Sequence, residues 1–189
     1  MTRIIAGRAG GRALLTPAGS ATRPTSDRVR EAMFSSLESL VELPGAVVLD
    51  LYAGSGALGL ETASRGASAV TCVEQDRGAA RLITRNARTL ALPAVSVACA
   101  RVETWLRRPP RAPGFDLVLA DPPYHLGERE VGMVLSLLPA HLAPGALVVV
   151  ERSSRSPDPA WPPGWKAGKS KRYGQTCLHR AWPADRVCT

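Results

Sequence analysis

The sequence lacks the features of a membrane protein or a metal-binding protein. No apolar run approaches the roughly 20 residues that span a bilayer, and the arginine-rich start has no long apolar segment like that of a signal peptide. The four cysteines include no C-x-x-C pair and the three histidines are scattered, so no metal site is indicated. We therefore expect a soluble, cytoplasmic protein with reduced cysteines and no bound metal.

Acidic residues are scarce at the two ends of the chain. The net charge is +8, and the first 30 residues carry six arginines against one aspartate, while residues 151–189 carry eight basic residues against three acidic ones. Basic ends favour a polyanionic partner, because phosphate contacts supply most sequence-independent affinity for nucleic acid. Only three of the 24 basic residues are lysines, so a coding bias toward arginine is the alternative explanation.

A glycine-rich turn lies between a predicted strand and a predicted helix. The apolar run 46–49 predicts a buried strand, and residues 58–64 predict a helix. Between them, Gly54 and Gly56 would let the backbone turn tightly and approach a ligand, while Asp50 could hold the loop through backbone N–H groups. This order is typical of a nucleotide-cofactor site.

The identity of the cofactor depends on a second motif. Residues 54–59 match G-x-G-x-x-G, and Glu74 follows the apolar run 69–73, where it could bind a ribose; together these would suit a nicotinamide dehydrogenase. A dehydrogenase has no use for the D-P-P-Y sequence at residues 121–124. With Asp50 four residues before the first glycine, the whole set resembles the S-adenosylmethionine-dependent methyltransferases that act on amino nitrogens.

The rest of the chain alternates apolar runs with helical patterns. This alternation implies right-handed crossovers and a doubly wound, mostly parallel α/β sheet. Ligands of such sheets bind outside the carboxyl ends of the strands, where Asp50, Glu74, residues 100–102 and Asp121 all fall. The predicted strands are residues 46–51, 69–74, 94–99, 115–120 and 146–151, with a closing hairpin formed by 165–173 and 176–182.

One predicted helix, residues 76–90, has an apolar face and an arginine-rich face. Four arginines are spaced along the outer side of this helix. A solvated face is the favoured interpretation of such a stripe, ahead of a binding surface. The four residues are Arg77, Arg81, Arg85 and Arg88.

Residues 1–20 predict a basic β-hairpin ahead of a main domain at 21–189. A hairpin this short buries little by itself, so it should lie on the main domain or on a partner, and its arginines make a partner plausible. The polar stretch 22–31 is either an ion-paired helix start or a segment that covers the cofactor and contacts phosphate. The candidate polyanion contacts are Arg3, Arg8, Arg12, Arg23, Arg28 and Arg30, and the candidate cofactor contacts here are Thr25 and Asp27.

The D-P-P-Y motif has the groups needed to activate an amino group on a base. Its prolines stop the strand and present the Asp121 carboxylate, the Pro122 carbonyl and the Tyr124 ring. If Asp121 and Pro122 accept the two N–H bonds of the amino group, its lone pair turns toward the methyl donor while Tyr124 stacks on the base. The base must first be flipped out. Cysteine-dependent methylation of cytosine C5 is disfavoured, because no cysteine follows a proline.

Three segments in one order, residues 23–31, 50–61 and 121–124, resemble the bacterial RsmD family, and the resemblance runs from Arg3 to about Trp182. It implies a Rossmann-like class I methyltransferase fold with a seven-stranded sheet. It also implies an enzyme that uses S-adenosyl-L-methionine to methylate N2 of a guanine in 16S rRNA, with the hairpin recognising the target. The implied cofactor contacts are Asp50, Gly54, Ser55, Gly56, Glu74, Arg101 and Val102.

Some alternatives stay open. Where such enzymes usually have Asp or Asn for the adenine amino group this chain has Arg101, so we expect the Val102 backbone to contribute. Because D-P-P-Y does not choose among adenine N6, cytosine N4 and guanine N2, a DNA amino-methyltransferase is one alternative; a non-catalytic RNA-binding assembly factor is another. We expect a monomer that acts on 16S rRNA in the small ribosomal subunit or its assembly intermediate.

Overall fold

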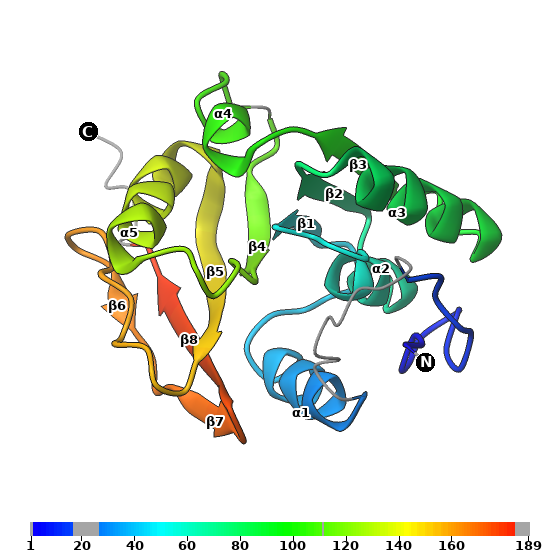
Figure 1. Cartoon of the computed structure of the whole chain (residues 1–189), viewed down its shortest axis with the longest axis horizontal. Helices are drawn as coiled ribbons and strands as arrows, with labels where there is room; N and C mark the ends of the chain where they lie inside the picture. Colours follow the sequence, from blue (N-terminus) through cyan, green and yellow to red (C-terminus); the bar gives the residue numbers. More distant parts are fainter. Residues whose placement is uncertain (1, 17–26, 111, 184–189) are drawn as a thin grey trace.

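The computed structural model describes residues 2–16, 27–110 and 112–183, which form an α/β fold around one sheet (Figure 1). The strands are β1 (Val47–Leu51), β2 (Ala69–Glu74), β3 (Val95–Cys99), β4 (Phe115–Ala120), β5 (Leu142–Ser153), β6 (Lys166–Ala167), β7 (Lys171–Tyr173) and β8 (Thr176–Trp182). The helices are α1 (Asp27–Leu37), α2 (Ala57–Ser64), α3 (Arg77–Thr89), α4 (Val102–Leu106), α5 (Glu128–Leu137) and the 3₁₀ turn η1 (Leu138–His141).

The strand order is β3-β2-β1-β4-β5-β8-β6, with β7 also paired to β8. Strands β1 to β5 pair in parallel and β8 runs antiparallel to β5, which confirms the predicted mostly parallel, doubly wound sheet. The sheet has eight strands where seven were expected, because residues 165–173 form two short strands in place of one. The break lies at Gly168, whose N–H donates to the Arg180 carbonyl and where a Cβ would lie 2.7 Å from the Trp182 ring.

Helices cover both faces of the sheet (Figure 1). Successive residues of a strand point to opposite faces, so Val48 packs on the side of α1, α2 and α3 while Leu49 packs on the side of α4 and α5. The paired residues of β4 and β5 follow the same alternation. These two apolar layers leave the carboxyl ends of the strands as the polar edge of the domain. No helix among the described residues is long and apolar enough to cross a membrane.

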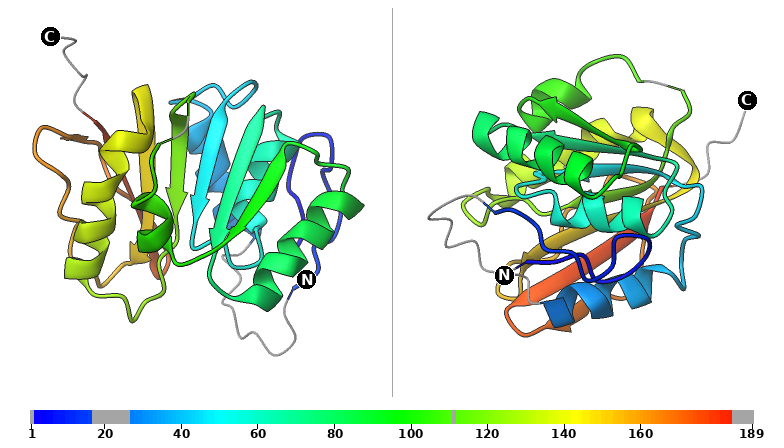
Figure 2. Two further views of the ribbon diagram at one scale, coloured as in Figure 1. Left: turned by 90° about the horizontal axis from the view of Figure 1, so that it is seen from above. Right: turned by 90° about the vertical axis from the view of Figure 1, so that its right-hand side faces the viewer.

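The N-terminal segment folds back on itself and packs on the main domain. Its two arms make one bridge, between Arg3 and Ala13, and Ile4, Ala9 and Leu14 are buried in the same apolar cluster as α1 and α2. Figure 2 shows this segment alongside those helices. Of the two places expected for the hairpin, the main domain is the one observed.

A buried carboxylate fixes this packing. Glu61 of α2 is fully buried and accepts hydrogen bonds from the backbone N–H groups of Ile5 (2.6 Å) and Ala6 (2.9 Å) and from Arg65 Nε (2.8 Å). The Ser64 hydroxyl adds a bond from the Ala9 N–H at 3.0 Å. No local pattern in the sequence distinguishes Glu61 from the other residues of its helix, so this role was not predicted.

Candidate functional site

The register of the parallel strands brings the motif residues into one row. Leu51 of β1 pairs with the residue before Glu74 on β2 and with the last residue of β4, so Glu74, Tyr52 and Asp121 follow next to one another across the sheet. β5 continues the row with Glu151. The glycine turn and the D-P-P-Y motif therefore open on the same edge.

The glycine turn has the geometry that its sequence predicts. Gly54 and Gly56 have φ values of 55° and 77°, in the left-handed region that other residues rarely adopt. A Cβ at Gly56 would lie 2.9 Å from Ile83 of α3, so the turn also lies close to its neighbours. The Gly54 N–H donates to Glu74 Oε2 at 2.8 Å, and Ser55 between the glycines is half-buried.

Asp50, in β1, supports the structure around this turn through a buried hydrogen bond. Its carboxylate is only 1% exposed and accepts the Gly59 N–H at 2.9 Å, so the backbone bond predicted for the loop is made to the first turn of α2 instead. Gly59 allows this approach, because a Cβ there would lie 2.9 Å from Asp50 Oδ2 and 2.6 Å from Cys72 Sγ. Asp50 therefore positions the start of α2, and the residues above it are left to contact a cofactor directly.

The buried carboxyl of Asp50 should make stability depend on pH. Burial, with a smaller contribution from the Glu74 charge, raises its pKa from 3.8 to about 7. The folded protein then keeps a proton that the unfolded chain releases above about pH 4, so the free energy of unfolding should fall by about 4 kcal/mol as pH rises to about 7. Asp50→Asn should remove this fall and be the more stable protein at pH 8. Urea denaturation of both proteins at pH 5 and pH 8 tests this; identical pH profiles would contradict it.

On the β2–β3 side, the groups predicted to bind the cofactor's nucleoside lie close together. Glu74 is half-buried, its Oε1 accepts the Asp76 N–H at 2.7 Å, and its carbonyl accepts the Ala100 N–H at 3.0 Å. The Arg101 side chain is 74% exposed and lies 3.7 Å from Glu103. The Val102 side chain is buried in the core, so the contact predicted for this residue could come only from its backbone.

On the β4 side, the D-P-P-Y motif ends the strand and forms a turn. The Asp121 N–H donates to the Leu51 carbonyl at 3.3 Å, and the Leu126 N–H donates to the Pro123 carbonyl at 2.8 Å. Pro122 is buried while Tyr124 is 50% exposed, so the Tyr124 ring presents a surface on which a base could stack. Arg152, only 3% exposed, holds this turn by donating to the Leu126 carbonyl at 2.9 Å and by pairing with Glu128.

The electrostatic environment of Asp121 is unusual. The residue is exposed, yet protein surrounds its carboxylate closely enough that desolvation raises its pKa well above the usual range. The charges of Glu151 and Asp50 raise the pKa further, and Arg152 opposes them. Such shifts are typical of groups that exchange protons in a reaction.

Three residues of this edge were missed by the sequence analysis: Tyr52, Glu151 and Arg152. Burial, and then the charge of Glu103, raises the pKa of Tyr52. A signal was present for Glu151 and Arg152, because two charged residues directly follow the apolar run of β5. For Tyr52 the signal was its position next to the glycine motif, two residues before Gly54. In the structure its φ is 59°.

The predicted RNA contacts separate into three groups. Arg3, Arg8 and Arg12 are exposed on the N-terminal segment, and Arg12 donates to the Thr89 carbonyl at the end of α3. The prediction that Arg30 contacts RNA is wrong. Arg30 is 2% exposed and donates to the Arg3 carbonyl at 2.7 Å, so it holds the N-terminal segment and has no surface for RNA. Arg23 and Thr25 lie outside the described residues, and the side chains of Asp27 and Arg28 are also outside them.

The residues of this edge fit S-adenosyl-L-methionine. The glycine turn leaves room for close backbone approach, and Glu74 can accept hydrogen bonds from ribose hydroxyls. A metal is not needed for this fit. Within the described ranges, no three Asp, Glu, His or Cys residues are grouped so that they could hold a metal ion.

Comparisons with known proteins agree with this geometry. The family model described as conserved hypothetical protein 95 matches residues 2–182. Ribosomal RNA small subunit methyltransferase D of Escherichia coli is 35% identical over 173 residues, covering 92% of this chain and 85% of the relative. The protein of the same name from Haemophilus influenzae is 35% identical over 174 residues, covering 91% and 89%.

Solved structures extend the match to three dimensions. The structure of the putative methyltransferase yhhF from Escherichia coli has a TM-score of 0.86 and 31% identity, covering 98% of this chain and 99% of that one. A magnesium protoporphyrin IX methyltransferase from Synechocystis with bound S-adenosylmethionine has a TM-score of 0.65 at 13% identity, covering 83% and 79%, and shares the fold alone. Because the family model spans nearly the whole chain and the curated relatives match most of it, the chain belongs to the RsmD family of class I methyltransferases.

Proposed function

We propose that the protein transfers a methyl group from S-adenosyl-L-methionine to N2 of a guanine in 16S rRNA of the small ribosomal subunit. The observation that carries this proposal is the juxtaposition of the D-P-P-Y turn and the glycine turn on one edge of the sheet. The choice of RNA over DNA is supported by the names of the curated relatives, which are ribosomal RNA methyltransferases.

Three residues of the D-P-P-Y motif orient the target base and accept its proton. When bound, S-adenosyl-L-methionine would supply an electrophilic methyl group, whose bond to sulfur breaks as the bond to nitrogen forms, leaving S-adenosyl-L-homocysteine. The ionised Asp121 carboxylate and the Pro122 carbonyl accept the two N–H bonds of the guanine amino group, and Tyr124 stacks on the flipped base. The new N–CH₃ bond requires the nitrogen to lose one proton, and Asp121, whose pKa is raised by burial and by the charges of Glu151 and Asp50, can receive that proton and release it to water.

Target recognition is assigned to the N-terminal segment. Arg3, Arg8 and Arg12 are the exposed basic residues of segment 2–16, and their charge can neutralise RNA phosphates. The buried Ile4 and Leu14 tie the segment to the core, so it presents these arginines in a fixed position. We further propose that the protein acts as a cytoplasmic monomer on the assembled subunit or its assembly intermediate.

A methyl-transfer assay tests this function directly. Labelled S-adenosyl-L-methionine is supplied with small subunits that lack their native guanine-N2 methylation, with naked 16S RNA, or with duplex DNA. The expected result is label in a guanine of the subunit RNA. Label in DNA would favour the DNA amino-methyltransferase, and no label despite measurable cofactor binding would favour a non-catalytic assembly factor.

A further inference from the structure

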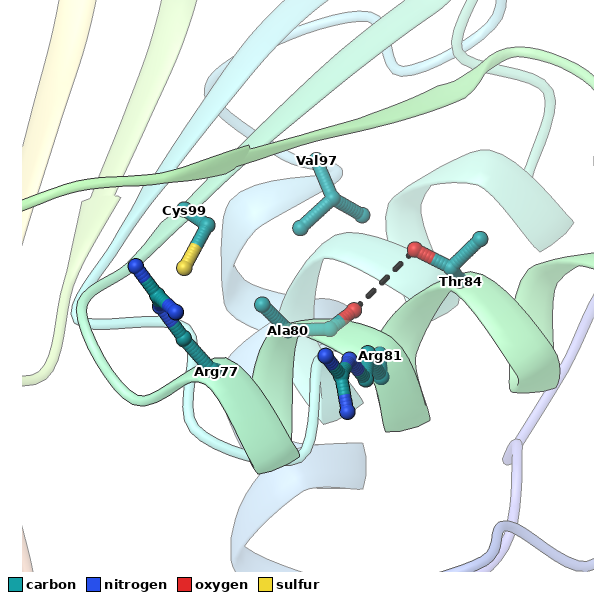
Figure 3. Close-up of a pocket in the computed structure, with 6 residues that line it drawn as sticks. All are labelled: Arg77, Ala80, Arg81, Thr84, Val97 and Cys99. Carbon is teal, nitrogen blue, oxygen red and sulfur yellow. Dashed lines mark hydrogen bonds between the residues drawn. The ribbon is translucent and has the colours of Figure 1, made fainter.

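A groove follows the outer end of the sheet, between α3 and the edge strand β3 (Figure 3). It consists of two adjoining hollows, of about 330 and 750 Å³, that share Thr84 and Val97. Among the described strands, β3 has a neighbour on one side only, so nothing described covers this edge. We refer to this surface as the α3–β3 groove.

The helical wall of the α3–β3 groove is basic. Arg77 and Arg81 line the first hollow and Arg88 lines the second, all three exposed, while Arg85 of the same helix lines neither. Helix α3 contains no acidic residue, and no described acidic residue forms an ion pair with these three side chains. Three of the four arginines thus lie along the groove, spanning roughly 16 Å of the helix, where the sequence favoured a simple solvated face.

The wall formed by β3 and the segment before it is largely apolar. Figure 3 shows Val97 and Cys99 pointing from β3 toward α3, with Cys99 near Arg77, and Val95 and Pro93 continue this surface in the second hollow. A basic wall beside an apolar one suits a single-stranded nucleic acid, because phosphates pair with cations while bases rest against apolar side chains.

The two ends of the α3–β3 groove meet the two surfaces assigned to the reaction. At one end, Cys99 pairs in register with Glu74, so the groove opens next to the cofactor edge. At the other end, α3 finishes at Thr89, whose carbonyl accepts a hydrogen bond from Arg12 of the N-terminal segment. Figure 2 also shows that segment and α3 at the same end of the molecule. The groove therefore connects the catalytic edge with the exposed N-terminal arginines.

We propose that the α3–β3 groove binds a single-stranded segment of the RNA substrate adjoining the target guanine, with its phosphates on Arg77, Arg81 and Arg88. The inference rests on the proposed function and specifies the path of the RNA across the protein. A single-stranded segment is consistent with a target base that must be unpaired to be flipped out.

The test compares Arg77→Ala/Arg81→Ala/Arg88→Ala with the wild type. Alanine suits an exposed helix, so the variant should fold. Its affinity for a fluorescent single-stranded RNA of about 16 nucleotides, measured by anisotropy at several salt concentrations, should fall on the order of 10- to 100-fold, and the salt slope should decrease by about 2. The affinity of the variant for the cofactor should be unchanged.

Two single substitutions on α3 distinguish an effect of the groove on RNA binding from an effect of net charge. Arg81→Ala should weaken RNA binding and lower the salt slope, whereas Arg85→Ala, one turn away and outside the groove, should leave the slope unchanged. Equal effects of the two single variants, or wild-type RNA affinity in the triple variant, would overturn the inference. Unchanged RNA affinity with weaker binding to whole subunits would also overturn it and indicate an acidic ribosomal protein as the occupant. If the wild type transfers no methyl group to any RNA the proposed function fails, and the anisotropy comparison still decides the groove.

Discussion

Asp121→Ala is expected to lower the rate of methyl transfer by about 10³-fold while the cofactor's dissociation constant stays nearly unchanged. The reason is its place in the row of motif residues: Asp121 directly follows β4, on the other side of β1 from the Glu74 that is expected to bind the cofactor. Alanine removes the acceptor that orients the amino group and the base that takes its proton. Single-turnover methyl transfer and calorimetric binding of S-adenosyl-L-methionine measure the two effects separately.

Asp121→Asn is the matched variant that tests whether Asp121 takes up the proton. Its amide oxygen can still accept one N–H bond, but the neutral amide cannot take up a proton. In the wild type, the rate should rise with pH as the raised pKa of Asp121 is passed, because only the ionised carboxylate accepts both the hydrogen bond and the proton. Asp121→Asn should lose this rise. If Asp121→Ala lowers cofactor affinity as much as it lowers methyl transfer, the role of the residue is structural.

Glu61→Ala is expected to lower the free energy of unfolding by about 3–5 kcal/mol. The substitution leaves the N–H groups of Ile5 and Ala6 and the guanidinium of Arg65 without their buried acceptor. Against a total stability of about 5–15 kcal/mol, such a loss is large. Urea denaturation measures it, and hydrogen exchange at the Ile5 and Ala6 amides should report the release of the N-terminal segment.

Glu38→Ala is the control for this prediction. Glu38 pairs with the same arginine at 2.7 Å, but its side chain is 46% exposed. Removing an exposed partner should cost no more than about 1 kcal/mol, since water screens and replaces it. If the two variants lose similar stability, the buried carboxylate does not anchor the N-terminal segment.

This anchoring also changes how target recognition should be tested. Deleting residues 1–20 would remove Ile4, Ala9 and Leu14 from the core together with the exposed arginines. A loss of activity would then mix stability with binding. Substituting Arg8, which is exposed, separates the two effects.

The local patterns of the sequence determined the fold class and the chemistry of the site. Alternating apolar runs and helical periods predicted the parallel sheet, because strand and helix periodicities depend on neighbouring residues. Gly54 and Gly56 predicted the tight turn, and the D-P-P-Y motif predicted where β4 ends, because glycine and proline restrict the backbone directly. The same motifs carried the family resemblance.

The tertiary structure alone decided which charged residues make buried contacts within the protein and which are exposed on its surface. Arg30 was expected on RNA and is buried against the Arg3 carbonyl, Glu61 anchors a segment 55 residues away, and three of four similar arginines on α3 line a groove. An arginine or glutamate has the same local preferences in each of these settings. Its role is set by the partners that distant segments bring to it, because a buried charge is stable only where those partners satisfy it.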